Sequence, residues 1–222
     1  ASGQPLLRVK DDDGKETRLR ARLLKVNSET RVAEAIDSVS MERDTLRATA
    51  DYARFDDNSG LGLLLGRPRA WDGETTVTGD TLETVAVKRQ LERVIVRGGA
   101  KLDYAGAHDA NRGESSRLTG TRVDMFVRES TIDSLMATGL ARNAYTAAAK
   151  EGKTAENNET KGDTILIYFK DKKIDRARVT GGATGEYRPP VAVGDSTAAR
   201  LERVTYAGRH IDFVIPKNRI VL

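Results

Sequence analysis

The stretch GDTILIYFKDKKIDRARVTGGATGEY, residues 162–187, has a near copy earlier in the same chain. That copy, GDTLETVAVKRQLERVIVRGGAKLDY at residues 79–104, has the same length and nine identities in 26 positions. Between the two, GTRVDMFVRESTIDSLMATGLARNAY at residues 120–145 aligns with both without a gap. A sequence that repeats at a fixed interval is typical of proteins that stack one supersecondary unit. The chain therefore predicts a repeat architecture.

Glycine, alanine and tyrosine keep the register of the repeat. The first glycines, Gly79, Gly120 and Gly162, are 41 and 42 residues apart, and the unit at 208–222 begins with Gly208 but is partial. The same two intervals separate Gly98, Gly139 and Gly181, then Ala100, Ala141 and Ala183, then Tyr104, Tyr145 and Tyr187. An aliphatic residue stands at a fixed offset in each unit: Leu91, Ile132, Ile174 and Ile220.

Alternating apolar residues predict β-strands inside each unit. A period of two places every second side chain on one buried face. The alternating positions are Leu82, Thr84 and Ala86, then Val123, Met125 and Val127, then Ile165, Ile167 and Phe169, then Ile211, Phe213 and Ile215. A second strand in each unit ends at glycine, where we expect a sharp turn with positive φ. Residues 130–152 are rich in helix formers, but their place in the repeat favours strand.

The predicted fold class is all-β, a solenoid-like stack of repeated strand units in one domain spanning residues 1–222. Residues 1–78 contain looser units of the same kind, with polar turns such as DDDG at 11–14 and DDNSG at 56–60. One unit cannot bury its apolar face alone, so units must stack edge to edge and pair their backbone groups. The partial last unit would leave an edge strand free to pair with another chain.

Composition narrows the classes of function. The chain has 37 basic and 33 acidic residues, a formal net charge of +4, and basic residues interleaved with acidic ones along the sequence. We therefore expect no nucleic-acid partner, while an anionic lipid remains compatible. There is no cysteine, and no apolar run approaches the length of a membrane-spanning helix. A start at ASGQP fits either a mature chain after removal of a signal peptide or a trimmed chain.

The glycine-aspartate units resemble a known repeat. The pattern of GD and Thr, then Ile or Leu with an acidic residue and Arg, then Val and GGA, together with ADYARFDDNSGLGLLLG at 50–66 and TTVTGD at 75–80, resembles the OstA-like repeat. That family comprises the lipopolysaccharide-transport proteins LptA, the periplasmic part of LptC and the N-terminal domain of LptD. The resemblance covers roughly residues 40–222. It implies an elongated, V-shaped β-jelly roll, or β-taco, whose apolar groove carries acyl chains.

The resemblance implies a function for the apolar positions. It implies periplasmic binding of lipopolysaccharide, or a similar anionic lipid, and its transport to the outer membrane, with inner- or outer-membrane partners. It also implies joining to other OstA-like modules through edge strands, including head-to-tail self-association. The candidate lipid-binding groove residues are Leu82, Val123, Met125, Ile165, Ile167, Phe169, Ile211 and Phe213. Units of 41–46 residues with polar insertions depart from the compact family pattern, which keeps open a periplasmic domain of a larger outer-membrane assembly protein.

From the residues alone, a structural or interaction solenoid with a filled core is the other reading. We expect no enzyme, because no catalytic motif occurs and the acidic residues Glu92, Asp133 and Asp175 recur with the repeat. The segment that contains His108, Glu114 and Ser115 has the composition of a loop, so we expect no catalytic dyad there. DDNSG lacks the later glutamate of a calcium loop, so it predicts a turn. No metal site and no cofactor are predicted. Asp80 and Asp163, each directly after glycine, are expected to be turn residues.

Overall fold

The structure is a computed structural model that describes residues 5–10, 16–106, 112–129, 131–149, 151–171, 173–192, 203–214 and 219–221. All the regular secondary structure in these residues is β-strand, which confirms the predicted all-β class. Helices of the length and apolar character needed to cross a membrane are absent from them. The predicted DDDG turn at 11–14 and His108 lie outside the described residues, as do the side chains of Ile215 and Ile220.

The chain divides into two compact units, and each is described by itself. Unit 1 contains Ala1–Ala100 and Asp124–Ile132, and unit 2 contains Lys101–Val123 and Asp133–Leu222. Three long strands contribute residues to both units: β10 (Gln90–Ala105), β11 (Ser115–Arg128) and β12 (Thr131–Thr146). The assignment of residues 1–222 to a single domain stays a prediction.

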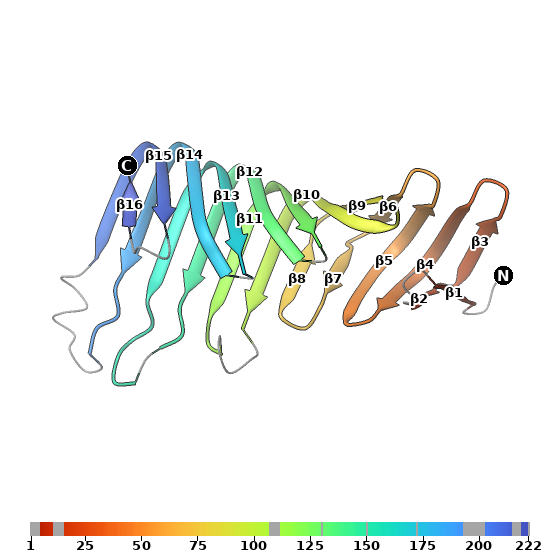
Figure 1. Ribbon diagram of the computed structural model, residues 1–222, viewed down its shortest axis with the longest axis horizontal. Coiled ribbons are helices and arrows are strands. Elements are labelled where there is room, and N and C mark those ends of the chain that lie inside the picture. The colour runs from red at the N-terminus through yellow and green to blue at the C-terminus, as the bar shows by residue number, and fades with distance from the viewer. Residues whose placement is uncertain are drawn as a thin grey trace. The chain divides into compact units, whose positions relative to one another are not determined.

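Unit 1 begins with short strands and continues with longer ones (Figure 1). Its strands are β1 (Leu6–Lys10), β2 (Glu16–Arg20), β3 (Leu23–Asn27), β4 (Val32–Arg43), β5 (Leu46–Asp56), β6 (Leu61–Leu65), β7 (Arg69–Trp71), β8 (Thr75–Thr78) and β9 (Thr81–Val87). Strand β4 pairs with β2 along one half and with β3 along the other. Strand β5 likewise pairs with β6 along one half and with β7 along the other. The two halves of a long strand thus belong to two different half-sheets.

Unit 2 is built from the longest strands. Besides parts of β10, β11 and β12 it contains β13 (Asn157–Lys170), β14 (Lys173–Arg188), β15 (Val204–Val214) and β16 (Arg219–Val221). Neighbouring strands pair antiparallel in the order β12, β13, β14, β15, β16. Figure 1 shows the ribbons of β13 and β14 arching over part-way along their length. Residues 131–146 form a strand, as the repeat predicted, despite their helix formers.

A two-residue bulge bends strands β4, β10, β12 and β14, and the same backbone conformation links β6 to β7; we call each of these positions a corner. At each corner two successive residues have positive φ: Asp37–Ser38, Gly66–Arg67, Gly98–Gly99, Gly139–Leu140 and Gly181–Gly182. In β12 the register steps from Thr138 to Ala141 against one intervening residue of β13, so two residues oppose one. The sequence predicted a turn that ends a strand here. The strand continues instead, because a bulge bends the ladder without breaking it.

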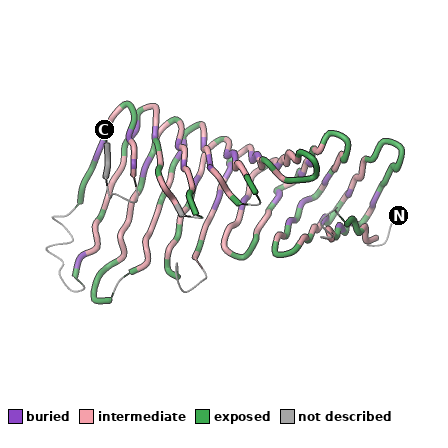
Figure 2. The backbone as a smooth tube through the Cα atoms, in the orientation of Figure 1, coloured by how far each residue is buried: buried purple, intermediate pink, exposed green. Residues whose placement is uncertain are grey.

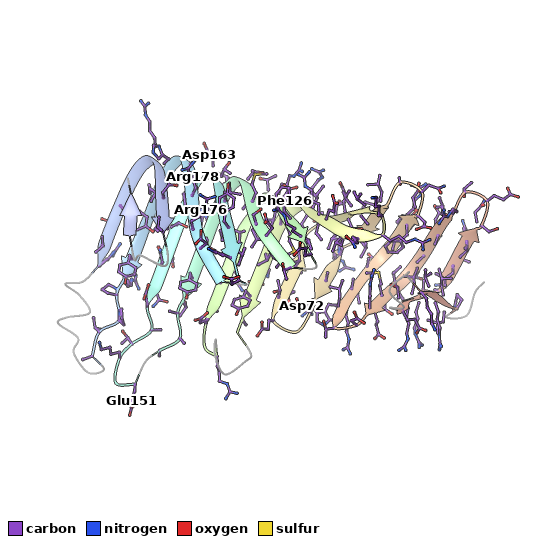
Figure 3. The ribbon with its side chains drawn as sticks, viewed as in Figure 1. Asp72, Phe126, Glu151, Asp163, Arg176 and Arg178 are labelled. Atoms are coloured by element: carbon purple, nitrogen blue, oxygen red, sulfur yellow. The ribbon has the colours of Figure 1, made fainter. Side chains whose placement is uncertain are left out.

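The residue opposite each corner is also fixed in type. A Cβ atom added to Gly181 would overlap the side chain of Asp163, and one added to Gly98 would overlap that of Asp80. Asp163 is labelled beside the arch of the strands in Figure 3. The prediction that Asp163 is a turn residue is wrong, because it lies inside β13. The predicted turn at 56–60 is confirmed, since the Asp56 carboxylate accepts hydrogen bonds from the backbone N–H groups of Asn58 and Ser59.

Candidate functional site

In each unit, candidate groove residues share the strand face that carries buried apolar side chains: Leu82 in unit 1, and Ile165, Ile167, Ile211 and Phe213 in unit 2. We call this the inner face, because it carries the buried side chains of the alternating pattern. In unit 2, cross-strand pairing places Ala137, Ile165, Val179 and Ile211 in one row beside the corners, and Leu135, Ile167, Ala177 and Phe213 in the next row. In unit 1, Leu82 lies in the corresponding row between Leu64 and Val96. The role of the eight candidates as a lipid-binding groove stays a prediction.

Exposure of the inner face rises with distance from the corner. Along β13, Ile165 is 1% exposed and Ile167 is 3% exposed, whereas Phe169 is only half-buried. Along β11, Val123 is buried and Met125 is half-buried. Figure 2 shows buried segments within the strands and exposed residues at the hairpin turns. Six of the eight candidates are thus buried within their own units, and Met125 and Phe169 are half-buried.

The two half-strands on either side of a corner come together on this face in unit 2. Tyr206 and Phe213 lie on opposite sides of Arg209, the residue of β15 that faces the corner of β14, and their rings meet edge to face with centroids 5.6 Å apart. The Tyr206 hydroxyl donates a hydrogen bond to Asn158 Oδ1 at 2.5 Å. Its ring lies over Gly185, where an added Cβ would overlap it. The chain of β15 is therefore folded so that its inner faces pack against each other.

In unit 2 the two half-sheets have different chemistry. We call residues 133–138, 164–170, 173–180 and 210–214 the aliphatic arm, because its inner face carries Ile, Leu, Val and Phe. We call residues 141–146, 157–161, 183–188 and 204–207 the tyrosine arm. Its inner face begins with buried Ala141 and Ala183 beside the corner and continues outward with polar and aromatic side chains: Asn143, Tyr145, Asn158, Thr160, Tyr187 and Tyr206.

Burial sets the ionisation of the tyrosine arm. Burial, with the nearby carboxylates of Glu114 and Glu156, raises the pKa of Tyr145 to about 12. Burial also raises the pKa of Tyr187, to which Glu156 contributes, and that of Tyr206. These phenols are therefore neutral hydrogen-bonding groups at physiological pH. The sequence marked Tyr145 and Tyr187 only as repeat positions. Their spacing of four from Ala141 and Ala183 already placed them on the same strand face.

The polar candidates do not assemble into a reactive site. Glu92 is exposed and is the extra residue of a bulge between Leu91 and Arg93, while Asp133 and Asp175 are half-buried. His210 lies on the outer face of β15, opposite Thr180. Within the ranges that the structure describes, no three His, Asp or Glu side chains are placed to hold a metal ion. The arrangement can sequester apolar groups and hydrogen-bond to polar ones.

Similarity to known proteins is found at the level of structure. No family model matches the chain, and no curated protein sequence matches it. Among solved structures, the crystal structure of LptH, the LptA-homologous periplasmic component of the lipopolysaccharide transport device of Pseudomonas aeruginosa, is similar to this chain. The two share 20% sequence identity and superpose with a TM-score of 0.48 over 72% of this chain and 93% of that chain.

Proposed function

We propose that this protein binds the acyl chains of a lipopolysaccharide-type amphiphile along its inner face and carries it through the periplasm to the outer membrane. One observation supports this above the others: the apolar inner face is packed beside the corners and half-exposed farther away, at Met125 and Phe169. A face that stays partly open while made of apolar side chains is the kind that an amphiphile covers. The motif resemblance to the OstA-like repeat points to the same ligand.

The energetics suit a carrier. Each CH₂ group removed from water contributes roughly 0.8 kcal/mol, so partial enclosure of several acyl chains is enough to hold a lipid. Dispersion and hydrophobic contacts have no fixed direction, so an acyl chain can move along the inner face without breaking a hydrogen bond. Six inner-face side chains are buried: Leu82 in unit 1, and Val123, Ile165, Ile167, Ile211 and Phe213 in unit 2.

The second candidate is a structural solenoid with a filled core. The burial of those six side chains favours it, because they fill the space beside the corners without a ligand. On that reading the half-exposed residues are only a rim. The two candidates differ in what touches Phe169, and neither requires catalysis.

Photo-crosslinking separates the two candidates. We expect p-benzoylphenylalanine placed at Phe169, or at Met125, to form adducts with lipopolysaccharide in cells. The matched control is Tyr168, which is the next residue of β13, is also aromatic and lies on the outer face. It should give no lipid adduct. Adducts absent at both inner positions would sink the carrier and favour the filled core, and adducts with phospholipid alone would replace the proposed ligand.

We propose that the edge strands are the surfaces at which protein partners bind. In the described part of the chain β1 pairs only with β2, so its other edge keeps unpaired backbone N–H and C=O groups. Such an edge can accept a strand from another OstA-like module or from a second copy of this chain. We propose end-to-end joining through such edges as the way in which the carrier hands on its ligand.

A further inference from the structure

Cross-strand pairing gathers cations on the outer face of unit 1. Along one row, Arg20 lies opposite Leu6 and Ser40, Ser40 opposite Thr49, and Thr49 opposite Arg69. The next row runs from Arg8 through Arg18, Glu42 and Arg47 to Trp71. We call this surface the arginine face. It comprises Arg8, Lys10, Arg18, Arg20, Arg47 and Arg69, all of them exposed.

The arginine face is strongly unbalanced in charge. Among the described residues, its two rows contain five arginines and one carboxylate, Glu42, a net charge of +4, while Lys10 lies opposite Glu16 in the next row. Glu16 accepts a hydrogen bond from Arg18 at 2.6 Å. Arg8 lies directly opposite Arg18 across the strand pair, and like charges in that position destabilise a sheet. Because repulsion between these cations destabilises the sheet, a ligand of opposite charge would bind this surface favourably.

The edge of this face beside the corners is hollowed. One open depression of about 460 Å³ is lined by Ser38, Ser40, Thr49, Asp51 and Arg67, among others. A second of about 310 Å³ is lined by Arg20, Ala21, Arg22, Ser38 and Ser40. Hydroxyl and guanidinium groups are donors that suit phosphate oxygens. Two carboxylates at this edge, Asp37 and Asp51, are paired with Arg22 and Arg67.

We propose that the arginine face docks on the surface of an anionic phospholipid bilayer. The face crosses β1, β2, β4, β5 and β7, and the four spacings between these strands extend it over about 19 Å. The cations occupy two rows across this width, which matches a two-dimensional array of phosphates better than a single linear polyanion. Arginine forks bind phosphate in a bidentate manner. Trp71, with the Arg69 guanidinium 5.0 Å from its ring centroid, adds an amphipathic side chain of the kind that gathers at membrane interfaces.

This inference goes beyond the proposed function, because it uses the outer face of unit 1 and not the inner face. The two can fail separately. Loss of bilayer docking leaves lipid adducts at Phe169 intact, and loss of those adducts leaves docking intact.

Vesicle co-sedimentation tests the proposal. We expect the whole chain to sediment with vesicles of equimolar phosphatidylcholine and phosphatidylglycerol but not with phosphatidylcholine alone, and added salt should release it. The double variant Arg20→Ala/Arg47→Ala should bind the anionic vesicles roughly 30-fold more weakly, about fivefold for each arginine. Both side chains are exposed, so the unfolding midpoint should be unchanged.

The matched control removes the same charge from another surface. Arg142 and Lys161 are exposed register partners in unit 2, and Arg142→Ala/Lys161→Ala should bind vesicles like the unmodified protein. An equal loss in this control would overturn the proposal, since it would show a response to net charge alone. Equal binding to neutral vesicles, or tighter binding to duplex DNA or a sulfated polysaccharide than to the anionic vesicles, would overturn it as well.

Discussion

The inner face beside a corner and the inner face at the far end of the same strand differ in almost every property. Beside the corner the side chains are small or aliphatic, such as Ala141, Ile165 and Ala183, and they are buried to within 1%. Toward the far end they are larger, such as Phe169 and Tyr145, and half-buried. Within one strand, the corner end is therefore closely packed, and the far end is less completely buried.

The largest expected effect separates these two ends on β13. Ile165→Ala removes a fully buried side chain next to the corner and should lower the free energy of unfolding by about 3 kcal/mol. Phe169→Ala, on the same face four residues away, should cost about 1 kcal/mol because its ring is already half-exposed. Denaturant unfolding of both variants measures the difference. Equal losses would show that the far end is part of the core after all.

Lipid binding should reverse that order. Phe169→Ala should weaken capture of lipopolysaccharide more than Ile165→Ala does, when both variants are compared at a temperature where each is folded. A variant pair that loses stability and capture in parallel would contradict the division between the two ends.

A smaller effect tests the corner itself. Gly181 and Gly182 both have positive φ, so alanine at either position is strained by about 1 kcal/mol. At Gly181 the new Cβ would also overlap Asp163, whereas at Gly182 no atom lies within 4 Å of it. Gly181→Ala should therefore lower the unfolding free energy by about 2 kcal/mol, roughly twice the loss at Gly182. Matching losses would mean that the corner yields freely around Asp163.

The smallest effect is a titration at the far end. Tyr145 should release its proton near pH 12, above the usual value of about 10 for tyrosine, as read from the difference in phenolate absorbance between the protein and Tyr145→Phe. Because the folded state holds this proton more tightly than the unfolded state, the unfolding free energy should fall as pH rises from about 10 to 12. The Tyr145→Phe variant should lose less over that window.

The control for this titration is the same measurement on the protein with an amphiphile bound. Acyl chains packed on the tyrosine arm would exclude water from Tyr145 and raise its pKa further. A titration near the ordinary tyrosine value in the ligand-free protein would show that the far end is open to water at this position.

Most of the fold could be predicted from the periodicity of the sequence. Alternation placed Ile165, Ile167 and Phe169 on one face, and the repeat identified residues 131–146 as strand although Leu135, Met136 and Ala137 favour helix by propensity. A gap-free register outweighs propensity because each strand's pairing is set by its neighbours. The corners at Gly98, Gly139 and Gly181 were recognised as glycine positions with positive φ, whereas the corner at Asp37–Ser38 was not. Their nature as bulges was not, since a turn and a bulge need the same backbone conformation at Gly181.

The pairing between strands that are distant in the chain could not be predicted from the sequence. Arg20, Arg47 and Arg69 are far apart along the chain and each has acidic neighbours in sequence, so no basic cluster was visible. The strand register brings them onto one face. The different chemistry of the aliphatic and tyrosine arms also depends on which half-strand lies on which side of a corner. Neither can be read before the corners are placed.

The repeated bulge has a consequence for how such a molecule can grow. Strand β5 has 11 residues and β14 has 16, yet both keep their buried alanine or valine positions in phase with a bend. Adding residues in pairs at a hairpin tip leaves that phase untouched, because strand faces repeat every two residues. The strands can therefore become longer while the corners keep their positions. A module with short strands can in this way be extended to hold a longer ligand without a change at its corners.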